Sequence, residues 1–481
     1  MDYSQFLVMK QEIGLLAVFL LVFLFDTFMP RGRQGAVGMV GCILFAIFTA
    51  FGFCPSFTCG VTDAFSGMYN SSAAVVNIKN ILNIGALIVM IQALRWADQE
   101  MTRIRRGEFY ELLLVTLFGM YLMISARHFL LFVIGLETAS LPLAAMVAFD
   151  KHRYESREAA VKYVLTAVFS SAIFLMGLSF VYGLAGTLYF DGIALALWGE
   201  GVNTLLIVAL AFVIAGIGFK LSLVPFHLWT ADVYQGAPTP VTSYLSVISK
   251  GAAAFAFLVI LWQAFGQVYS QAWEWMLYAL IILTITVGNL FAMRQRNIKR
   301  FLAFSSISQA GYIVLGVIAM NPMGMSALMY YVLVYIFSNL AAFGVIGAIE
   351  NNSGKLWIDD YKGLYKTNPR LAFTMMLAMF SLAGIPPFAG FFSKFFIFTS
   401  AINQGSIAIY VLVLIALINT IISLYYYLLV VKAMFISQDD CVIPNFRSAC
   451  SERLALWVCV AGIIFLGIVS CVYNHLLQVA A

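Results

Sequence analysis

Long apolar stretches recur along almost the whole chain, and they limit what it can fold into. A helix needs about 20 mostly apolar residues to cross a hydrocarbon layer about 30 Å thick, and fourteen segments of this sequence meet that requirement. Hydrophobic residues make up 63% of the chain and charged residues 10%, whereas soluble domains average about 45–50% and about 25%. The sequence therefore predicts an all-α membrane protein. It excludes a string of soluble domains, a disordered tail and a nucleic-acid binder.

The segments between the predicted spans are too short for a soluble domain. The first span has no cationic region before it and no small-residue cleavage site after it, so we expect it to be retained rather than removed as a signal peptide. We place the spans at residues 13–29, 37–53, 73–94, 108–125, 129–149, 160–187, 203–224, 240–264, 273–293, 299–320, 324–349, 371–399, 405–432 and 453–474.

The loops predict the orientation, because cytoplasmic loops of membrane proteins are enriched in lysine and arginine. Loops after odd-numbered spans hold twenty of the 27 Lys and Arg residues. The N-terminus and the loops after even-numbered spans hold only Lys10 and Arg127. We therefore expect both termini on the non-cytoplasmic side, and the asymmetry supports an even number of spans.

Five lysines are left over, and all of them lie inside predicted spans. An ionisable side chain at this depth costs about 2.5–3.5 kcal/mol to insert, so we expect a function for most of them. A desolvated lysine can release its proton, whereas an arginine keeps its charge. The alternative is a lysine that reaches a span end or holds a carboxylate for structure, and it applies most to Lys79. The five are Lys79, Lys162, Lys220, Lys250 and Lys394.

One carboxylate lies as deep as these lysines. Glu137, in IGLETASLP, falls in the middle of the fifth span, whereas Asp26 and Glu111 lie near the ends of theirs. The charged form of such a carboxylate is stabilised when a lysine lies within about 4–6 Å. A buried hydrogen-bonding role is the alternative for Glu137.

Two spans contain helix breakers close to a lysine. In GFKLSLVPFHLW, Pro225 follows Lys220, and in SLAGIPPFAGFFSKF, Pro386 and Pro387 precede Lys394. Proline removes a backbone donor and clashes with the preceding turn, so we expect both helices to be interrupted. A break that recurs in two halves of a membrane protein is typical of inverted repeats whose discontinuous helices flank an ion path. Ordinary kinked helices are the alternative.

Uncharged polar residues near the lysines fit a water-filled path. Hydroxyls and amides can hold a chain of water that relays protons, although hydrogen bonds between helices are their commoner use in membranes. These residues are Thr242, Ser246 and Ser249, then Ser305, Ser306, Ser308 and Gln309, and finally Ser338 and Asn339.

The chain shows no motif for a nucleotide, a metal ion or an iron–sulfur cluster. It has no GxGxxG, GxxxxGK[ST] or HExxH, and no CxxC pair. We therefore expect no redox cofactor and no metal on this chain. Cys54 and Cys59 share one loop that is predicted to lie outside, where an oxidising compartment permits a disulfide.

Several motifs together resemble a known family. The stretch GFKLSLVPFHLWTADVYQGAPTPVTSYLSVISKGAAAF, together with GLETASLP, EAAVKYVLTAVFSSA, RFLAFSSISQAGY and AGIPPFAGFFSKF, closely resembles the antiporter-like, proton-conducting membrane subunits of respiratory complex I. The resemblance implies about fourteen transmembrane helices with two inverted five-helix repeats, spans 4–8 and 9–13, each with a broken helix at span 7 or 12. It divides the chain into an N-terminal three-helix segment (1–107), a first repeat (108–264), a second repeat (265–432) and a C-terminal loop with the last helix (433–481).

The resemblance also assigns roles to the buried residues. It implies that Glu137 and Lys220 form the central ion pair, that Lys250 connects the two half-channels and that Lys394 is the terminal group towards the outside. Lys162, in the KY motif of the sixth span, is implied to modulate the pair. Family members often have His where this chain has Gln309, and because Gln cannot carry a proton, a relay there has to use water.

The resemblance implies a proton-translocating subunit of a complex in the cell inner (plasma) membrane. NADH, FMN, iron–sulfur clusters and quinone are expected on partner subunits, and neighbouring antiporter-like subunits and lipid are expected to contact this chain. The L-type subunit continues beyond the point where this chain ends, and the M-type subunit has Glu at the position of Lys394, so neither type fits. The alternatives are a subunit of a Na⁺/H⁺ antiporter, whose cation would need several converging carboxylates, and a purely structural membrane anchor.

Overall fold

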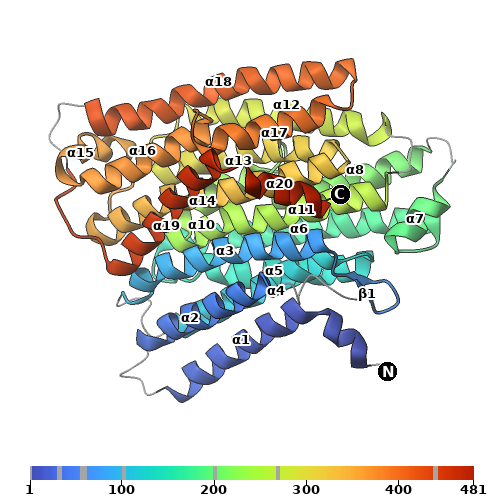
Figure 1. Ribbon diagram of the computed structural model, residues 1–481, viewed down its shortest axis with the longest axis horizontal. Helices are drawn as coiled ribbons and strands as arrows, with labels where there is room; N and C mark the ends of the chain where they lie inside the picture. The colour runs from blue at the N-terminus through green and yellow to red at the C-terminus, as the bar shows by residue number, and fades with distance from the viewer. Residues whose placement is uncertain are drawn as a thin grey trace.

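The computed structural model describes residues 3–29, 35–54, 62–99, 105–198, 203–266, 271–436 and 442–480. Figure 1 shows a bundle of helices that run side by side along one direction, with α1 and α2 at one edge and α18 at the other. Cys59 lies outside the described residues, and so does the predicted Cys54–Cys59 disulfide.

The N-terminal segment contains three long helices and a small hairpin that the sequence did not predict. Residue pairs Asp63–Asn70 and Ala64–Tyr69 form its antiparallel register. The elements are η1 (Tyr3–Val8), α1 (Lys10–Phe28), α2 (Gly35–Gly52), β1 (Asp63–Ala64), β2 (Tyr69–Asn70) and α3 (Ala73–Ala97).

The two predicted repeats follow. The first consists of α4 (Arg106–Ser125), α5 (Phe129–Val147), α6 (Tyr154–Ala185), α7 (Phe190–Ala196), α8 (Thr204–Leu221), α9 (Leu228–Gly236), α10 (Thr239–Tyr244), the π-helix η5 (Leu245–Ser249) and α11 (Lys250–Gln263). The second consists of α12 (Gln271–Ala292), α13 (Ile298–Ile318), α14 (Pro322–Ser353), η6 (Ile358–Tyr361), α15 (Leu364–Thr367), α16 (Pro369–Ala383), α17 (Ala389–Ile402) and α18 (Ile407–Ile436). The chain ends with α19 (Cys450–Ile468) and α20 (Cys471–Ala480).

The two repeats use the same local devices. The second helix of each begins at a side-chain cap, His128 or Asn297, which accepts a hydrogen bond from a backbone N–H two residues later. The third helix of each has 32 residues and ends at a glycine in the left-handed conformation. The capping residues also form matching β-bridges, His128 with Tyr189 and Asn297 with Trp357.

The predicted spans agree with these helices. Among the described residues, thirteen helices are long and apolar enough to cross a membrane, and the twelfth predicted span is the pair of shorter helices α16 and α17. The break of the seventh span comes after Leu221, where Ser222 adopts a left-handed conformation. Gly384, which follows the last residue of α16, adopts a left-handed conformation too. The last predicted span is too long, because the helix stops at Ile468 and α20 starts after a turn.

The middle of the bundle is formed by the helices that carry most of the predicted polar path. α13 is buried along almost its whole length, as are α10, η5, α11 and most of α14. The edge helices α1, α6 and α18 instead expose large apolar side chains, among them Leu24, Phe169 and Ile421. Such faces suit contact with lipid or with an apolar partner helix.

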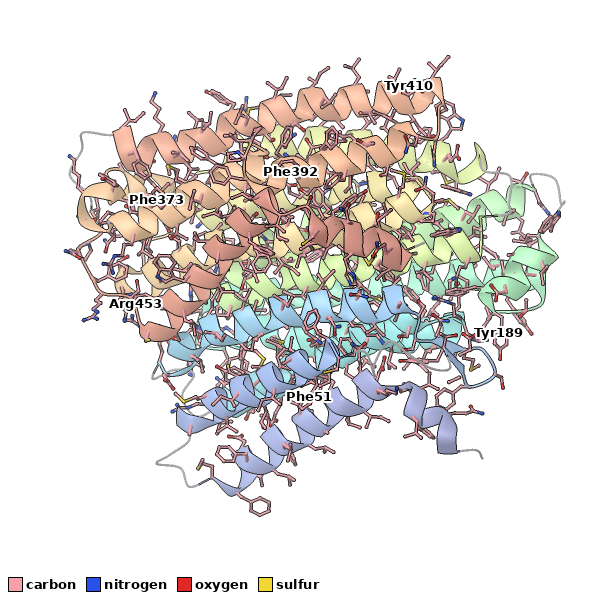
Figure 2. The ribbon with its side chains drawn as sticks, viewed as in Figure 1. Phe51, Tyr189, Phe373, Phe392, Tyr410 and Arg453 are labelled. Carbon is pink, nitrogen blue, oxygen red and sulfur yellow. The ribbon has the colours of Figure 1, made fainter. Side chains whose placement is uncertain are left out.

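The cations separate the two ends of the bundle. Figure 2 places Arg453 at one end of the bundle and Tyr189 at the other. Beside Arg453, Glu452 bonds Arg95 and Asn351, and Glu350, the neighbour of Asn351 in the chain, lies within 4.0 Å of Arg153 and Lys299. This cation-rich end also holds Arg300, next to Lys299, and Arg106, which bonds Asp98 at the end of α3. Arg127, one of the two exceptions in the charge count, lies at the same end as Tyr189 and donates to Asn70 at 3.1 Å. Burial lowers the pKa of Arg127 to about 10, opposed by the charges of Asp191 and Asp63, so its guanidinium is charged at neutral pH. The loop carboxylates explain why one arginine is tolerated there.

Candidate functional site

The structure does not place Glu137 and Lys220 in an ion pair. Lys220 is the next-to-last residue of α8 and is buried, and its Nζ donates to the hydroxyl of Tyr163 at 3.3 Å. Glu137 is half-buried on α5 and accepts a hydrogen bond from Ser171 Oγ at 2.5 Å. No ion pair within 4.0 Å joins these two described residues. In this conformation each member of the predicted pair is held by a hydroxyl instead.

Lys250 begins α11 directly after the π-helix, at the centre of the bundle. Its side chain is 1% exposed, and its Nζ donates to Ser306 Oγ at 2.7 Å and to the Ser306 carbonyl at 3.3 Å. The ring of Tyr234 lies 5.6 Å from the same Nζ. π-helical turns are frequent at functional sites. Lys250 therefore contacts the polar run of α13 that the sequence singled out.

Lys394 lies beside the break between α16 and α17. Its Nζ donates to the carbonyls of Leu382 and Ala383, each at 3.1 Å. These are among the last carbonyls of α16, which have no partner within their own helix. Gly390 lets α17 come close, because a Cβ there would overlap the Ser381 carbonyl. The break thus gives a buried lysine two neutral acceptors and no carboxylate.

A cluster around Gln309 lies beside Lys394. Tyr331 donates to Gln309 Oε1, and Gln309 Nε2 donates to Tyr427 Oη at 3.2 Å and to the Leu382 carbonyl at 3.3 Å. Leu382 is also an acceptor of Lys394. A cavity of about 10 Å³ is lined by Lys394, Gln309, Tyr331 and Tyr335 together with residues of α14, α16 and α17. The hydroxyl of Tyr335 is buried without a hydrogen-bond partner among the described residues, which suits a bound water.

His227 lies in the interrupted segment between α8 and α9. It is buried, and its Nδ1 has no hydrogen-bond partner in the part of the chain that the structure describes. The segment comes between Lys220 and Lys250 in the chain. A buried imidazole with a free nitrogen can accept and return a proton.

Lys162 lies apart from the predicted pair, near the cation-rich end. Its Nζ bonds Glu158 and Asp232, each at 2.7 Å, and Asp232 also bonds Arg300 at 2.6 Å. Asp232 is on α9, so this network ties α9 to α6 and α13. The sequence interpretation did not consider Asp232, although it stands in the quoted motif WTADVYQ.

Two further buried lysines form ion pairs whose partners the sequence interpretation did not name, and for Lys79 the structure shows the alternative left open there, a lysine that holds a carboxylate. Lys79 is fully buried and bonds Glu12 of α1 at 2.5 Å, and Tyr69 donates to the same carboxylate at 2.7 Å. Lys299, assigned to a span end, is also fully buried; it donates to the Ala237 carbonyl at 2.6 Å and lies 4.0 Å from Glu350. No group of three or more potential metal-binding side chains occurs among the described residues.

Comparison with known proteins identifies the family. Residues 126–423 match the family described as NADH:quinone oxidoreductase/Mrp antiporter, TM. NADH-quinone oxidoreductase subunit N of Phocaeicola vulgatus is 54% identical over 481 residues, which is 100% of both chains. The protein of the same name from Azobacteroides pseudotrichonymphae is 50% identical and covers 99% of this chain and 98% of its own.

Solved structures agree with the sequence relatives. A chain of respiratory complex I from Thermus thermophilus superposes with a TM-score of 0.79 at 32% identity, over 95% of this chain and 97% of that chain. A chain of the Mrp complex from Dietzia sp. superposes with a TM-score of 0.81 at 22% identity, over 100% of this chain and 97% of that chain, which shows a shared fold. This chain therefore belongs to the NADH:quinone oxidoreductase/Mrp antiporter family of membrane proteins, among the relatives named NADH-quinone oxidoreductase subunit N.

Proposed function

We propose that this chain is a proton-translocating membrane subunit of an NADH-quinone oxidoreductase in the bacterial inner (plasma) membrane, with both termini on the non-cytoplasmic side. Quinone reduction and its cofactors, NADH, FMN and iron–sulfur clusters, belong to partner subunits in this proposal. The observation that carries it is the series of buried lysines, Lys220, Lys250 and Lys394, none of which has a carboxylate within 4.0 Å among the described residues. A lysine without a counter-charge in a desolvated site releases its proton more readily than a paired one.

The contacts suggest how a proton would pass along the chain. Glu137 lies on α5 with its carboxylate held by Ser171, so breaking that bond would free it to approach Lys220 and hold the ammonium charged. When Glu137 returns to Ser171, Lys220 loses its counter-charge and can pass its proton through His227 or water to Lys250. From Lys250 the acceptors are Ser306 and then water beside Tyr335.

The second half of the route leads to Lys394. Tyr331, Gln309 and Tyr427 fix one another in a hydrogen-bonded cluster, and the small cavity beside them also reaches Lys394. Gln309 orients water in this proposal and does not carry the proton itself. Lys394 then releases the proton towards the outside, and the energy arrives from quinone reduction in the partner subunits.

A double mutant of the central residues tests the proposal. Glu137→Gln with Lys220→Met removes both charges, so neither leaves the other buried without a counter-charge. The glutamine can still accept a hydrogen bond from Ser171. The complex should therefore assemble in normal abundance, while NADH-driven acidification in sealed vesicles, measured with a pH-sensitive dye, falls together with quinone reduction. Lys362→Met, at an exposed lysine on the loop before α15, is the matched control. Normal pumping in the double mutant would refute the assignment.

A further inference from the structure

We propose that helix α6 sets whether Glu137 and Lys220 are joined or separated, with Ser171 as the positioning residue for Glu137 and Tyr163 as the positioning residue for Lys220. In this structure Ser171 donates to the Glu137 carboxylate at 2.5 Å, and Lys220 donates to the Tyr163 hydroxyl at 3.3 Å. One helix therefore holds the carboxylate and the amine apart. The inference rests on the proposed proton-translocating function and adds the residues that control the pair.

The two hydroxyls lie on one side of α6 but at different levels. Tyr163 and Ser171 are eight residues apart, which returns to nearly the same side of a helix with about 3.6 residues per turn. The rise between them is roughly 12 Å at about 1.5 Å per residue, whereas a salt bridge needs its two charged groups within about 4 Å. The two members of the predicted pair are thus anchored at separate levels of the bundle.

Lys220 belongs to a helix that packs tightly against α6. A Cβ at Gly216 of α8 would lie 2.5 Å from the Cβ of Phe174 on α6, so the two helices meet there without space for a side chain. Ser170 Oγ of α6 also donates to the Gly216 carbonyl at 3.0 Å. Contacts this close leave little room for one helix to slide past the other. We therefore treat α6 and α8 as one unit that carries Lys220.

Glu137 belongs to a different pair of closely packed helices. A Cβ at Gly135 of α5 would lie 2.6 Å from the backbone nitrogen of Met123 on α4. The hydrogen bond from Ser171 to Glu137 crosses from the α6–α8 pair to the α4–α5 pair. A small shift of one helix pair against the other would break this bond, because packed interfaces change between discrete arrangements. Ser171 is therefore placed to control when the carboxylate is released.

The hydroxyl of Tyr163 suits both protonation states of Lys220. A hydroxyl accepts a hydrogen bond from an ammonium group and donates one to a neutral amine, whereas an ionised carboxylate only accepts. The Tyr163 ring lies 5.2 Å from the ring of Trp229, and Trp229 Nε1 donates to the Phe219 carbonyl near the end of α8 at 3.2 Å. Tyr163 can therefore keep the amine beside the break of α8 before and after the amine loses its proton.

A zero-length cross-link measures how often the pair is joined. In the whole complex, a membrane-permeant carbodiimide activates a carboxyl group, which then forms an amide with a lysine amine in contact with it. Mass spectrometry quantifies the linked peptides, and Lys220→Met gives the background. We expect Ser171→Ala to raise the yield of the Glu137–Lys220 amide about fivefold or more, the effect of one buried hydrogen bond on an equilibrium. Ser171→Thr should keep the parent's yield, because threonine retains the hydroxyl.

Ser170→Ala is the matched control for Ser171→Ala. It removes the neighbouring hydroxyl of the same helix, whose bond goes to a backbone carbonyl of α8 and not to the pair. Equal amide yields in Ser171→Ala and Ser170→Ala would overturn the role of Ser171.

Tyr163→Phe tests the second positioning residue and keeps the inference testable if Ser171→Ala fails to assemble. It removes the hydroxyl and keeps the ring, so the amide yield should again rise about fivefold or more. Its control is Tyr330→Phe, which removes a buried hydroxyl that donates to the Leu466 carbonyl of α19 at 2.6 Å. Equal amide yields in the two variants would overturn the role of Tyr163.

Proton pumping in sealed vesicles, divided by the abundance of the complex, tests whether the separation of the pair matters for transport. A joined pair favours the charged form of Lys220, so Ser171→Ala and Tyr163→Phe should each lower pumping about fivefold or more, while both controls pump like the parent. A fall of equal size in the variants and their controls would show a structural effect and overturn the inference. Normal pumping in Glu137→Gln with Lys220→Met would overturn the proposed function itself. Loss of pumping there, with unchanged pumping and amide yield in Ser171→Ala and Tyr163→Phe, would overturn only the role of α6.

Discussion

Replacing Lys79 with methionine is expected to weaken the attachment of α1 to the bundle by about 3–5 kcal/mol, the usual cost of stranding one member of a buried ion pair. The side chain of Lys79 is 0% exposed and that of Glu12 is 2% exposed. After the substitution, the Glu12 carboxylate retains the hydroxyl of Tyr69 but loses its counter-charge. Because Glu12 lies on α1 and Lys79 on α3, the cost falls on the contact between these helices.

The double mutant separates the pair from the packing around it. Glu12→Gln with Lys79→Met removes both charges, so it should recover most of the loss, because replacing both partners by neutral groups is often nearly neutral. The exposed pair Lys362–Asp359, with side chains 43% and 68% exposed, is the control. Its removal should cost less than about 1 kcal/mol.

Local opening of α1 can be measured by thiol labelling. Leu15 lies on α1 and is fully buried, so a cysteine introduced there reacts only when α1 leaves its site. Since about 1.4 kcal/mol corresponds to a tenfold change in an equilibrium, Lys79→Met should speed labelling of Leu15→Cys about 100-fold or more when opening is fast. The double mutant should return the rate to within about tenfold of the parent. Equal labelling rates in the parent, single and double mutants would refute the argument.

Further substitutions test the rest of the network. Gln309→Leu should lower pumping and reduce the free energy of unfolding by about 1–3 kcal/mol, because the hydroxyl of Tyr331 loses its buried acceptor. Gln309→His should retain part of the pumping. Thermal unfolding measures the loss of stability, and acidification followed with a dye measures the pumping. Asp232→Asn should lower the free energy of unfolding by about 1–2 kcal/mol, since it weakens partly exposed, charge-assisted hydrogen bonds. Thermal unfolding at the parent's temperature would contradict this prediction. Lys394→Ala and Lys394→Arg should both abolish pumping, because alanine has no titratable group and an arginine keeps its charge and cannot release a proton. Lys394→Glu should retain part of the pumping, because a carboxyl group can take up and release a proton. Full pumping in Lys394→Arg would mean that the residue only caps α16.

The spans could be predicted from the sequence because each depends on local information. About 20 apolar residues suffice to define a span, and the proline clusters near Lys220 and Lys394 marked both breaks. The two breaks place their lysines differently, as the order of lysine and proline in the sequence indicated. Lys220 precedes the end of α8, whereas Lys394 lies well after the end of α16. The position of each lysine relative to its helix end depends on which residue adopts the left-handed conformation. A serine such as Ser222 does not indicate that conformation in a sequence, whereas a glycine often does.

The ion pairs could not be predicted, because their partners are distant in the chain. Glu12 and Lys79 come from different helices, and Glu12 stands at the start of a span where a carboxylate usually meets water. Lys299 and Glu350 were both assigned to loops or span ends, because hydropathy does not report what packs over a helix terminus. Lys299 is buried where its helix end packs against the junction of α9 and α10, and it donates to the Ala237 carbonyl there.

The partners of the lysines divide them into two groups. Lys79, Lys162 and Lys299 each have a carboxylate within 4.0 Å, and each joins a helix to its neighbours. Among the described residues, Lys250 and Lys394 donate to hydroxyl and carbonyl oxygens and to no carboxylate. The repeat explains part of this difference. Ser306 stands nine residues after the cap Asn297, as Glu137 stands nine residues after the cap His128.

The second repeat therefore has a neutral hydroxyl where the first has a carboxylate, and Lys250 donates to that hydroxyl. A carboxylate in its place would favour the charged form of Lys250, because an opposite charge nearby stabilises an ammonium group. The same comparison matches Asp232 and Lys394, each ten residues after a left-handed residue that ends the preceding helix, Ser222 or Gly384. Asp232 anchors α9 through two cations, whereas Lys394 has only neutral acceptors. Equivalent positions of the two halves thus carry a charge network in one half and, in the other, a lysine whose hydrogen bonds among the described residues go to carbonyl groups.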